Sequence, residues 1–481
     1  MNATRNYPFS EIRRKRVYFI GIGGVGMSAL ARWFLAKKWA VSGSDSAEST
    51  ITRNLEKAGV KVKIGQKKGN LPSGAGLFVY NQAISADNPE LREARRRKGV
   101  PVLSYAEAVG FLTRHYDTCA VAGSHGKSTT TSILSLALAK GGFDPTVIVG
   151  TLVREFGGRS GDGVNFRNGK KDLLVLEADE FHSSFLNYSP LHAIITNIDR
   201  EHLDWYEDFT NVKRAFLEFI KGMRNGGILI LNKDNKELRS LTKDISALSK
   251  KKEISLFWYS LHDKDARKIA KAMAHIPGTH MQSNAYAAFL LARHLGAKEK
   301  DILNAFKAYR GVWRRMEYKG ELKIQLACRT GRNSEFKISI YDDYGHHPTE
   351  IAATLRGAKE FFKKKNIICA FQPHQEKRLT ALFGEFVRAF DSADALFLFP
   401  VYKVAGRDGT GRTRDSGDLA EKIVRRGTIP NVFFLERFTL LLPWMEKVLS
   451  ERQLPYRDSV LIMMGAGNIN EETKKIVKDR K

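Results

Sequence analysis

The chain has 481 residues, of which 43% are hydrophobic and 27% charged; these values are typical of globular proteins, and the length predicts roughly three domains of about 150 residues. Its net charge of +27 indicates anionic partners, namely nucleic acid, a membrane surface or phosphorylated small molecules. The cysteines, Cys119, Cys328 and Cys369, are too few for a disulfide framework or a multi-cysteine zinc site and predict a reduced, cytoplasmic compartment.

Short apolar strands alternate with amphipathic helical stretches along the chain, which predicts an α/β fold with mostly parallel sheets. Glycines interrupt the apolar run at residues 17–31, and no stretch reaches the ~18–20 apolar residues that span a bilayer, so we expect neither a signal peptide nor membrane insertion. The predicted strands include residues 17–22, 77–80, 118–122, 173–177, 193–197, 228–232, 338–342, 367–371, 395–399 and 460–464.

Two junctions divide the chain into predicted domains 1–110, 111–315 and 316–481. The first junction precedes a second strand, glycine loop and helix, and a new strand-rich stretch begins near residues 311–320. The three segments carry net charges of +11, +9 and +7, so the positive charge is spread along the chain. Nucleic-acid-binding proteins more often concentrate it in one face, arm or tail, and no aromatic-rich RNA-binding signature is present, so no nucleic-acid partner is expected.

The first glycine loop follows the strand at 17–22 and opens a helix. Its glycines, which fit the pattern G-x-G-x-x-G, are Gly21, Gly23, Gly24 and Gly26. Such a loop lets backbone amides approach an anion at a helix N-terminus. Asp45 lies 24 residues after the first glycine, where an acid can hold a ribose hydroxyl. By itself the pattern indicates NAD or a related nucleotide, or a turn needed only for packing.

The second glycine loop, GSHGKS at 123–128, lies between a strand and a helix predicted at 129–140. It resembles a P-loop, in which backbone amides cradle phosphates, Lys127 reaches the β- and γ-oxygens, and Ser128 holds Mg²⁺. The strict motif is absent because Val121 occupies the position of its first glycine. The flanking strand and helix nevertheless favour phosphate binding over a structural turn.

Two acidic segments follow predicted strands downstream of this loop, EADE at 177–180 and DREHLD at 199–204. Each could be a solvated loop when taken alone. Both stand at strand ends after a P-loop, where a carboxylate such as Glu177 and an imidazole such as His202 can coordinate Mg²⁺ on ATP phosphates. Their joint position therefore favours a metal site.

In order and spacing these motifs resemble the Mur ligases, which build the peptide of the bacterial cell wall. The resemblance covers nearly the whole chain and rests on GIGGVGMS at 21–28, GSHGKS at 123–128, EADE at 177–180, TNIDREHLD at 196–204, DDYGHHPTE at 342–350 and FQPH at 371–374. It implies three domains: an N-terminal Rossmann-like domain for a UDP sugar, a central P-loop ATPase domain and a C-terminal Rossmann-like domain.

The resemblance also implies a reaction. The motifs are most similar to those of members that join L-alanine to the carboxylate of UDP-N-acetylmuramate, with ATP and Mg²⁺, in peptidoglycan precursor synthesis. ATP phosphorylates the muramoyl carboxylate, the amine of L-alanine attacks the acyl phosphate, and the intermediate collapses to an amide, ADP and phosphate. The first glycine loop then grips the UDP diphosphate rather than NAD. A cytoplasmic monomer or homodimer is expected.

Residue roles follow from the resemblance alone. The implied catalytic residues are Lys127, Glu177, His202, Arg315 and Asp343, and the implied metal ligands are Ser128, Glu177 and His202. The implied ATP-binding residues are Gly123, Ser124, His125, Gly126, Lys127, Ser128, Thr129, Asn284, Arg315 and Asp343. The UDP sugar would meet Gly21, Gly23, Gly24, Gly26, Asp45 and Ser85, and the amino acid would meet Tyr344, His346, His374 and Arg378.

The chain departs from the family pattern at several positions, none of which removes a metal or phosphate ligand. Met281 replaces an asparagine of the adenine motif, and Gln375 replaces an arginine of the amino-acid pocket. Glu201 stands before the metal histidine instead of Asp, His182 follows EADE instead of Asp, and Arg407 replaces an acidic residue.

Three alternatives to the L-alanine ligase remain open. The nearest is the recycling ligase of the same family, which adds a preformed peptide and which residues 314–317 (RRME) slightly favour. The net charge leaves a P-loop NTPase stimulated by nucleic acid as another hypothesis. A dinucleotide oxidoreductase would use the first glycine loop but would leave Lys127, Glu177 and His202 without a role.

Overall fold

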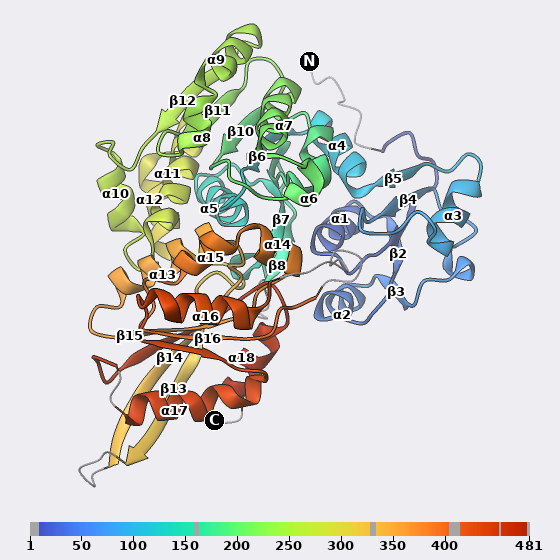
Figure 1. Ribbon diagram of the computed structural model, residues 1–481. Helices are drawn as coiled ribbons and strands as arrows, with labels where there is room; N and C mark the ends of the chain where they lie inside the picture. Colours follow the sequence, from blue (N-terminus) through green and yellow to red (C-terminus); the bar gives the residue numbers. More distant parts are fainter. Residues whose placement is uncertain (1–8, 158–162, 328–332, 404–413, 452–453, 479–481) are drawn as a thin grey trace. The chain divides into compact units, whose positions relative to one another are not determined.

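The computed structural model describes residues 9–157, 163–327, 333–403, 414–451 and 454–478. It shows a three-domain α/β fold with mostly parallel sheets (Figure 1), which confirms the predicted fold class. The chain forms two compact units, one of residues 1–273 and 282–312 with two sheets, and one of residues 274–281 and 313–481 with the third.

The first sheet is entirely parallel, in the order β3-β2-β1-β4-β5. Its strands are β1 (Arg16–Ile20), β2 (Ala40–Asp45), β3 (Lys61–Ile64), β4 (Leu77–Tyr80) and β5 (Val102–Ser104). The helices between and after them are α1 (Val25–Ala36), α2 (Thr50–Lys57), α3 (Pro89–Arg96) and α4 (Tyr105–His115). The central strand β1 places the first glycine loop at its carboxyl end, the edge where open α/β sheets bind ligands.

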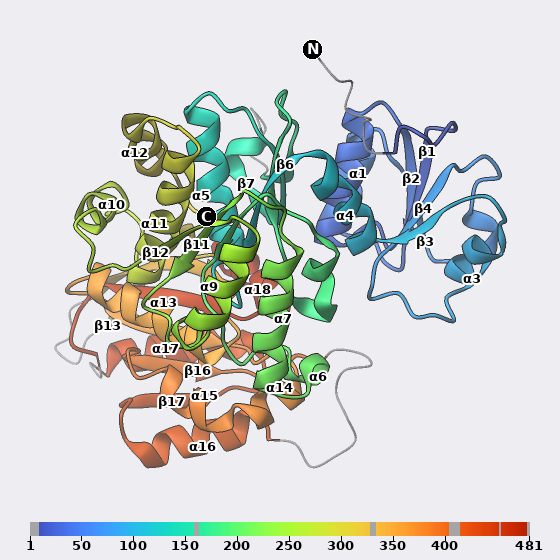
Figure 2. The ribbon, with the colours of Figure 1, turned by 90° about the horizontal axis from the view of Figure 1, so that it is seen from above.

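The second sheet has the order β12-β11-β10-β6-β9-β7-β8, and among its described ladders only the β7–β8 pair is antiparallel. Its strands are β6 (Asp117–Ala122), β7 (Thr146–Val153), β8 (Val164–Arg167), β9 (Leu173–Glu177), β10 (His192–Ile195), β11 (Ile228–Asn232) and β12 (Ser255–Tyr259). Its helices are α5 (Lys127–Lys140), α6 (Leu203–Tyr206), α7 (Phe209–Gly222), α8 (Lys236–Ser240), α9 (Thr242–Lys251), α10 (Ala266–Ala272), α11 (Thr279–His294) and α12 (Glu299–Ala308). Figure 2 shows α5 and α12 on one side of this sheet and α7 and α9 on the other.

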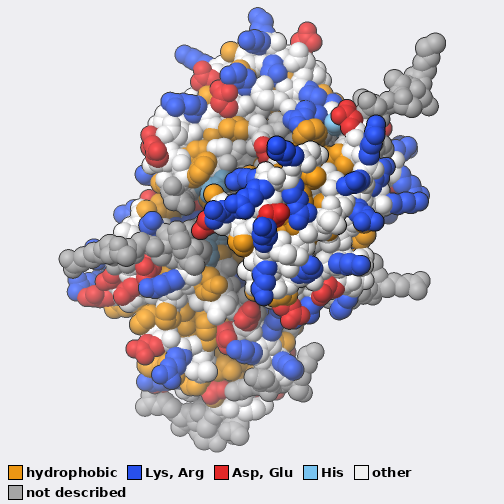
Figure 3. All heavy atoms as spheres, turned by 90° about the vertical axis from the view of Figure 1, so that its right-hand side faces the viewer, with side chains coloured by type: hydrophobic (Ala, Val, Ile, Leu, Met, Phe, Trp, Pro, Cys, Tyr) orange, Lys and Arg blue, Asp and Glu red, His pale blue; other side chains and the backbone are white. Residues whose placement is uncertain are grey.

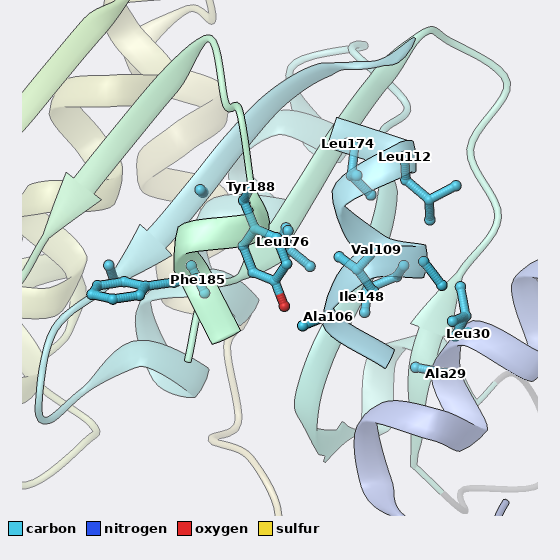
Figure 4. Close-up of a cluster of buried hydrophobic side chains, with 14 of the residues drawn as sticks. Ala29, Leu30, Ala106, Val109, Leu112, Ile148, Leu174, Leu176, Phe185 and Tyr188 are labelled. Carbon is cyan, nitrogen blue, oxygen red and sulfur yellow. The ribbon is translucent and has the colours of Figure 1, made fainter. Parts of the chain in front are cut away.

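One hydrophobic core joins the first two sheets. It combines side chains of α1 and α4 with side chains of the second sheet, as Figure 4 shows for Leu30, Val109 and Leu176. At its edge the buried Asn165 of β8 donates from Nδ2 to the backbone oxygen of Val25 and, over 2.8 Å, to Ser28 Oγ in α1. The first glycine loop and the second sheet therefore belong to the same packed unit.

The third sheet lies in the second unit, in the order β13-β14-β18-β15-β16-β17. Its strands are β13 (Glu317–Ala327), β14 (Asn333–Asp343), β15 (Asn366–Phe371), β16 (Ala395–Leu398), β17 (Asn431–Phe434) and β18 (Ser459–Met464). Only the β13–β14 pair is antiparallel among its described ladders. Its helices are α13 (Pro348–Phe361), α14 (Glu376–Ala381), α15 (Phe383–Ala389), α16 (Ser416–Arg426), α17 (Leu441–Ser450) and α18 (Ile469–Lys478).

The predicted strands all have counterparts, and the differences lie at strand ends. β10 ends at Ile195 rather than residue 197, because Thr196 and Asn197 turn away to bind the second glycine loop. Thr196 Oγ1 donates to the backbone oxygen of His125 over 2.6 Å, and Asn197 Oδ1 accepts from the His125 amide over 2.9 Å. β14 begins at Asn333, five residues before the predicted start, because it pairs along its length with β13.

One face of the molecule illustrates how the charge is spread. Lys and Arg side chains are dispersed over the face drawn in Figure 3, among acidic and hydrophobic ones. Among the described residues, no helix has both the length and the apolar character needed to cross a membrane.

The buried His192 predicts a loss of stability in mild acid. Burial, and then the positive charge of Arg224, lowers its pKa from 6.5 to about 4, although Asp117 opposes the shift. Between these two pKa values the unfolded chain therefore binds a proton that the folded chain does not. The stability of the fold with a neutral His192 is complete above pH 6.5 and is lost as the pH falls toward 4. Between pH 7 and pH 5 we expect the free energy of unfolding of the wild-type protein to fall by about 2 kcal/mol more than that of His192→Gln. Urea unfolding at both pH values checks this, and equal pH dependence in both proteins would contradict it.

Candidate active site

The second glycine loop connects β6 to α5 and is tied to the segment after β10. The Ser124 amide donates to the backbone oxygen of Asn197 over 3.1 Å, and Ser124 Oγ accepts from the Asp199 amide over 2.9 Å. His125 Nε2 lies 3.0 Å from Asp199 Oδ2. These contacts hold the loop at the N-terminus of α5, where Lys127, Ser128 and the buried Thr129 begin the helix.

The amino group of Lys127 folds back over this loop. Its Nζ donates to the backbone oxygens of Gly123 over 2.8 Å and Ser124 over 3.2 Å, and to Glu180 Oε2 over 2.7 Å. Burial by itself would lower the pKa of Lys127, but the negative charges of Glu180 and Asp179 raise it overall. The lysine is therefore a fixed positive charge at the mouth of the loop.

The acidic residues after β9 have different surroundings. Glu177 accepts from Ser128 Oγ over 2.9 Å and from the Gly150 amide over 2.6 Å, and burial raises its pKa against the effect of Lys127. The ligand atoms of Asp179, Glu180 and His202 lie within 4.8 Å of one another. The structure thus places His202 with Asp179 and Glu180, and Glu177 with Ser128.

Glu180, to which sequence reasoning gave no role, lies in a region where three residues have left-handed backbone. His182, Ser183 and His202 have φ angles of 51°, 55° and 57°, values that non-glycine residues rarely adopt and that often mark functional sites. In the same region Glu180 is 1% exposed, whereas the Asp179 side chain is 54% exposed. The EADE motif located the group of acids but could not show which of them faces inward.

Asn284, the predicted adenine contact, lies in α11 beside the same loop. A Cβ added to Gly126 would be 2.6 Å from Asn284 Oδ1, and Gly126 has a φ of +82°. We expect Gly126→Ala to raise KM for ATP about tenfold or more, because both the contact and the backbone must shift. Gly142→Ala is the matched control, since Gly142 has the same φ with nothing within 4 Å. Equal effects of the two substitutions on KM would contradict the expectation.

The first glycine loop closes around Asp45 and Asn81. Gly21 has a φ of +80°, and the Gly23 amide donates to Asp45 Oδ2 over 2.7 Å, so this carboxylate holds the loop itself. A Cβ on Gly24 would lie 2.5 Å from Asn81 Nδ2; Asn81, which follows β4, was not singled out from the sequence. Ser85 is exposed in the turn after β4.

The second unit gathers a separate polar cluster at the carboxyl end of β14. Arg315 lies 3.0 Å from Glu350 Oε1, and although burial opposes it, Glu350 and Asp343 raise the arginine pKa. Asp343 accepts from the Gly345 amide over 2.8 Å, and the Arg315 guanidinium lies over the Tyr344 ring. Within this unit the structure brings Arg315, Asp343 and Tyr344 together, with Glu350 as a partner to which sequence reasoning gave no role.

The other predicted amino-acid contacts lie nearby in this unit. The His346 and His374 rings are 6.1 Å apart, and His374 stacks on Tyr402. Arg378 is half-buried in α14. Gln375 has a φ of 69° and is buried, and its Nε2 has no hydrogen-bond partner in the described part of the chain. Arg407 lies outside the described residues.

Three family models match the chain in sequence order. They are the Mur ligase family catalytic domain at residues 16–117, the Mur ligase middle domain at 121–292 and the Mur ligase glutamate ligase domain at 329–467.

Similar proteins match this chain over nearly their whole length. The chain is 36% identical over 478 residues to a UDP-N-acetylmuramate–L-alanine ligase of Clostridium kluyveri, covering 96% of this chain and 97% of that one. It is 35% identical to the ligase of the same name from Desulfosudis oleivorans, covering 95% and 97%. The crystal structure of UDP-N-acetylmuramate–alanine ligase from Thermotoga maritima matches with a TM-score of 0.72 and 26% identity over 96% and 98%. A murein peptide ligase of Psychrobacter arcticus shares the fold, with a TM-score of 0.60 and 20% identity over 96% and 98%.

Proposed function

The chain belongs to the Mur ligase family, and from this premise we propose that it joins L-alanine to the carboxylate of UDP-N-acetylmuramate, forming ADP and phosphate from ATP. The observation that carries the proposal is the full-length similarity to L-alanine ligases, together with the lysine–carboxylate site at the second glycine loop. We place the reaction in the cytoplasmic part of peptidoglycan precursor synthesis.

The chemistry requires anions to be held together. A carboxylate is a poor electrophile, and transfer of the γ-phosphoryl group makes it an acyl phosphate with a good leaving group. The amine of L-alanine then attacks the acyl carbon, and phosphate departs. Lys127, already fixed against Gly123 and Ser124, neutralises charge that develops on the transferring group. The amides at the N-terminus of α5 bind the remaining phosphate oxygens.

The residues present fit Mg²⁺. Asp179, Glu180 and His202 offer oxygen and nitrogen donors at one place, and Ser128 with Glu177 offers a second oxygen pair. Carboxylate and hydroxyl oxygens are ligands that Mg²⁺ accepts beside ATP phosphates. The bound ion supplies neutralisation of phosphate charge. Glu177 and His202 remain our proposed ligands, and the contacts add Asp179 and Glu180 as candidates.

The second unit supports an amino-acid acceptor. Arg378 can pair with the L-alanine carboxylate by a bidentate hydrogen bond, and the buried Gln375 Nε2 is a further donor where the family usually has arginine. Arg314, one of the residues that favoured the recycling ligase, is 3% exposed and donates to the backbone oxygens of Gly465 and Gly467. Arg314 therefore supports the unit internally, which weakens that argument for a peptide acceptor.

Phosphate release measured with ATP, Mg²⁺ and UDP-N-acetylmuramate tests the proposal. The acceptors are L-alanine, glycine, L-serine and a tripeptide that represents the preformed peptide of the recycling ligase, each added alone. We expect L-alanine to give the highest kcat/KM. Turnover with the tripeptide alone would instead identify the recycling ligase. No release with any acceptor would refute the ligase activity, and stimulation by DNA or RNA would favour the nucleic-acid hypothesis.

A further inference from the structure

Tyr105, the first residue of α4, covers the end of the first glycine loop. A Cβ added to Gly26 would lie 2.8 Å from Tyr105 Cζ and 2.9 Å from its Oη. The helix is held in place by the buried side chains of Ala106, Val109 and Leu112, which pack in the core that joins the first two sheets (Figure 4). The ring is therefore a fixed feature beside the loop that we propose to bind the UDP diphosphate.

The same hydroxyl lies near the acidic residues after β9. Burial and, after it, the negative charges of Glu177 and Asp179 raise the pKa of Tyr105. A tyrosine phenol is protonated at physiological pH, so its oxygen carries a proton that it can donate. Tyr105 thus stands between the first glycine loop and the carboxylates beside Lys127.

The Tyr105 hydroxyl is available to donate a hydrogen bond to a ligand. In the described part of the chain, no hydrogen bond to the Tyr105 hydroxyl is found, although the residue is half-buried. A half-buried phenol hydroxyl that no protein group pairs can donate to solvent, or to a ligand oxygen that takes the place of that solvent. Tyr105 lies against Gly26 and feels the charges of Glu177 and Asp179, so a substrate with its diphosphate at Gly21–Gly26 and its carboxylate near Lys127 would pass close to this hydroxyl.

We propose that the Tyr105 hydroxyl donates a hydrogen bond to an anionic oxygen of the UDP sugar, either of the diphosphate or of the sugar acid. This inference rests on the proposed function. Tyr105 then positions the substrate between the first glycine loop and the phosphoryl-transfer site. The competing explanation is packing, in which the ring only fills the space above Gly26.

Tyr105→Phe separates the two explanations, because it keeps the ring and removes the hydroxyl. We expect UDP-N-acetylmuramate to bind roughly tenfold more weakly, the usual effect of losing a hydrogen bond to a charged group. Calorimetry without ATP measures Kd for UDP-N-acetylmuramate. Steady-state kinetics should show a matching rise in KM for UDP-N-acetylmuramate, whereas KM for ATP and for L-alanine should stay within about twofold of the wild-type values. UDP is a second probe: weaker UDP binding assigns the contact to the diphosphate, and unchanged UDP binding assigns it to the sugar acid.

Tyr116→Phe is the matched control at the other end of α4. It removes a hydroxyl that accepts a hydrogen bond over 3.3 Å from Nε1 of Trp33, which lies seven residues after Gly26 in α1. It should lower stability without changing Kd for UDP-N-acetylmuramate.

Three results would overturn the assignment: an unchanged Kd in Tyr105→Phe, an equal loss of affinity in Tyr116→Phe, or a loss confined to kcat. If the wild-type protein does not bind UDP-N-acetylmuramate, the proposed function fails first, and the role of Tyr105 falls with it.

Discussion

Lys127→Ala is expected to lower kcat for phosphate release at least about 1000-fold, a loss of about 4 kcal/mol of transition-state stabilisation. The amino group is held by two backbone oxygens of the loop and by Glu180. Its positive charge can therefore act on the phosphate without the side chain having to move during the reaction. No other described side chain forms this set of contacts. Phosphate release with all three substrates at saturation measures the effect.

Lys140→Ala is the control for this substitution. Lys140 is the last residue of the same helix and is exposed, so its loss should leave kcat within about twofold. Because the Lys127 variant leaves Glu180 buried without its cation, thermal unfolding and Kd for UDP-N-acetylmuramate should be measured in parallel. A folded Lys127→Ala protein that retains a tenth of the wild-type kcat would contradict the role.

Glu180→Gln is expected to lower kcat about 100-fold and to raise the Mg²⁺ concentration needed for half-maximal activity. The substitution keeps the size of the side chain but removes the charge that lies 2.7 Å from Lys127 Nζ and 3.7 Å from His202 Nε2. A buried carboxylate beside phosphates is effective only when it is charged and can share a cation. A Mg²⁺ titration of phosphate release measures both effects.

Asp179→Asn provides the comparison. Asp179 is one residue away, but its side chain is 54% exposed and lies 3.7 Å from Lys127. Solvent screens its charge, so we expect less than about a tenfold loss. If Asp179→Asn costs as much as Glu180→Gln, the inward position of Glu180 does not determine its role.

Much of the fold and the location of the site could be predicted from sequence. The two glycine loops were recognised because a strand, a turn and a helix start lie within about a dozen residues of one another. Asp45 shows what such spacing rules can and cannot give. Its distance along the chain predicts a contact with a ribose hydroxyl, which stays a prediction, and the structure adds that its carboxylate accepts from the Gly23 amide. The spacing predicted that Asp45 lies beside the loop and could not show which donor its carboxylate faces.

Local features were determined by the sequence alone: the α/β class, the two glycine loops between a strand and a helix, and the order of motifs that identifies the family. They depend on short-range backbone geometry, which a few neighbouring residues specify. Contacts between distant segments were decided by tertiary structure. The fold after β9 brings Glu180 within 2.7 Å of Lys127 Nζ and leaves Asp179 at 3.7 Å, and the packing of α4 on the joined core places Tyr105 over Gly26. Side-chain direction across a fold depends on which elements pack together, and no single stretch of sequence encodes it.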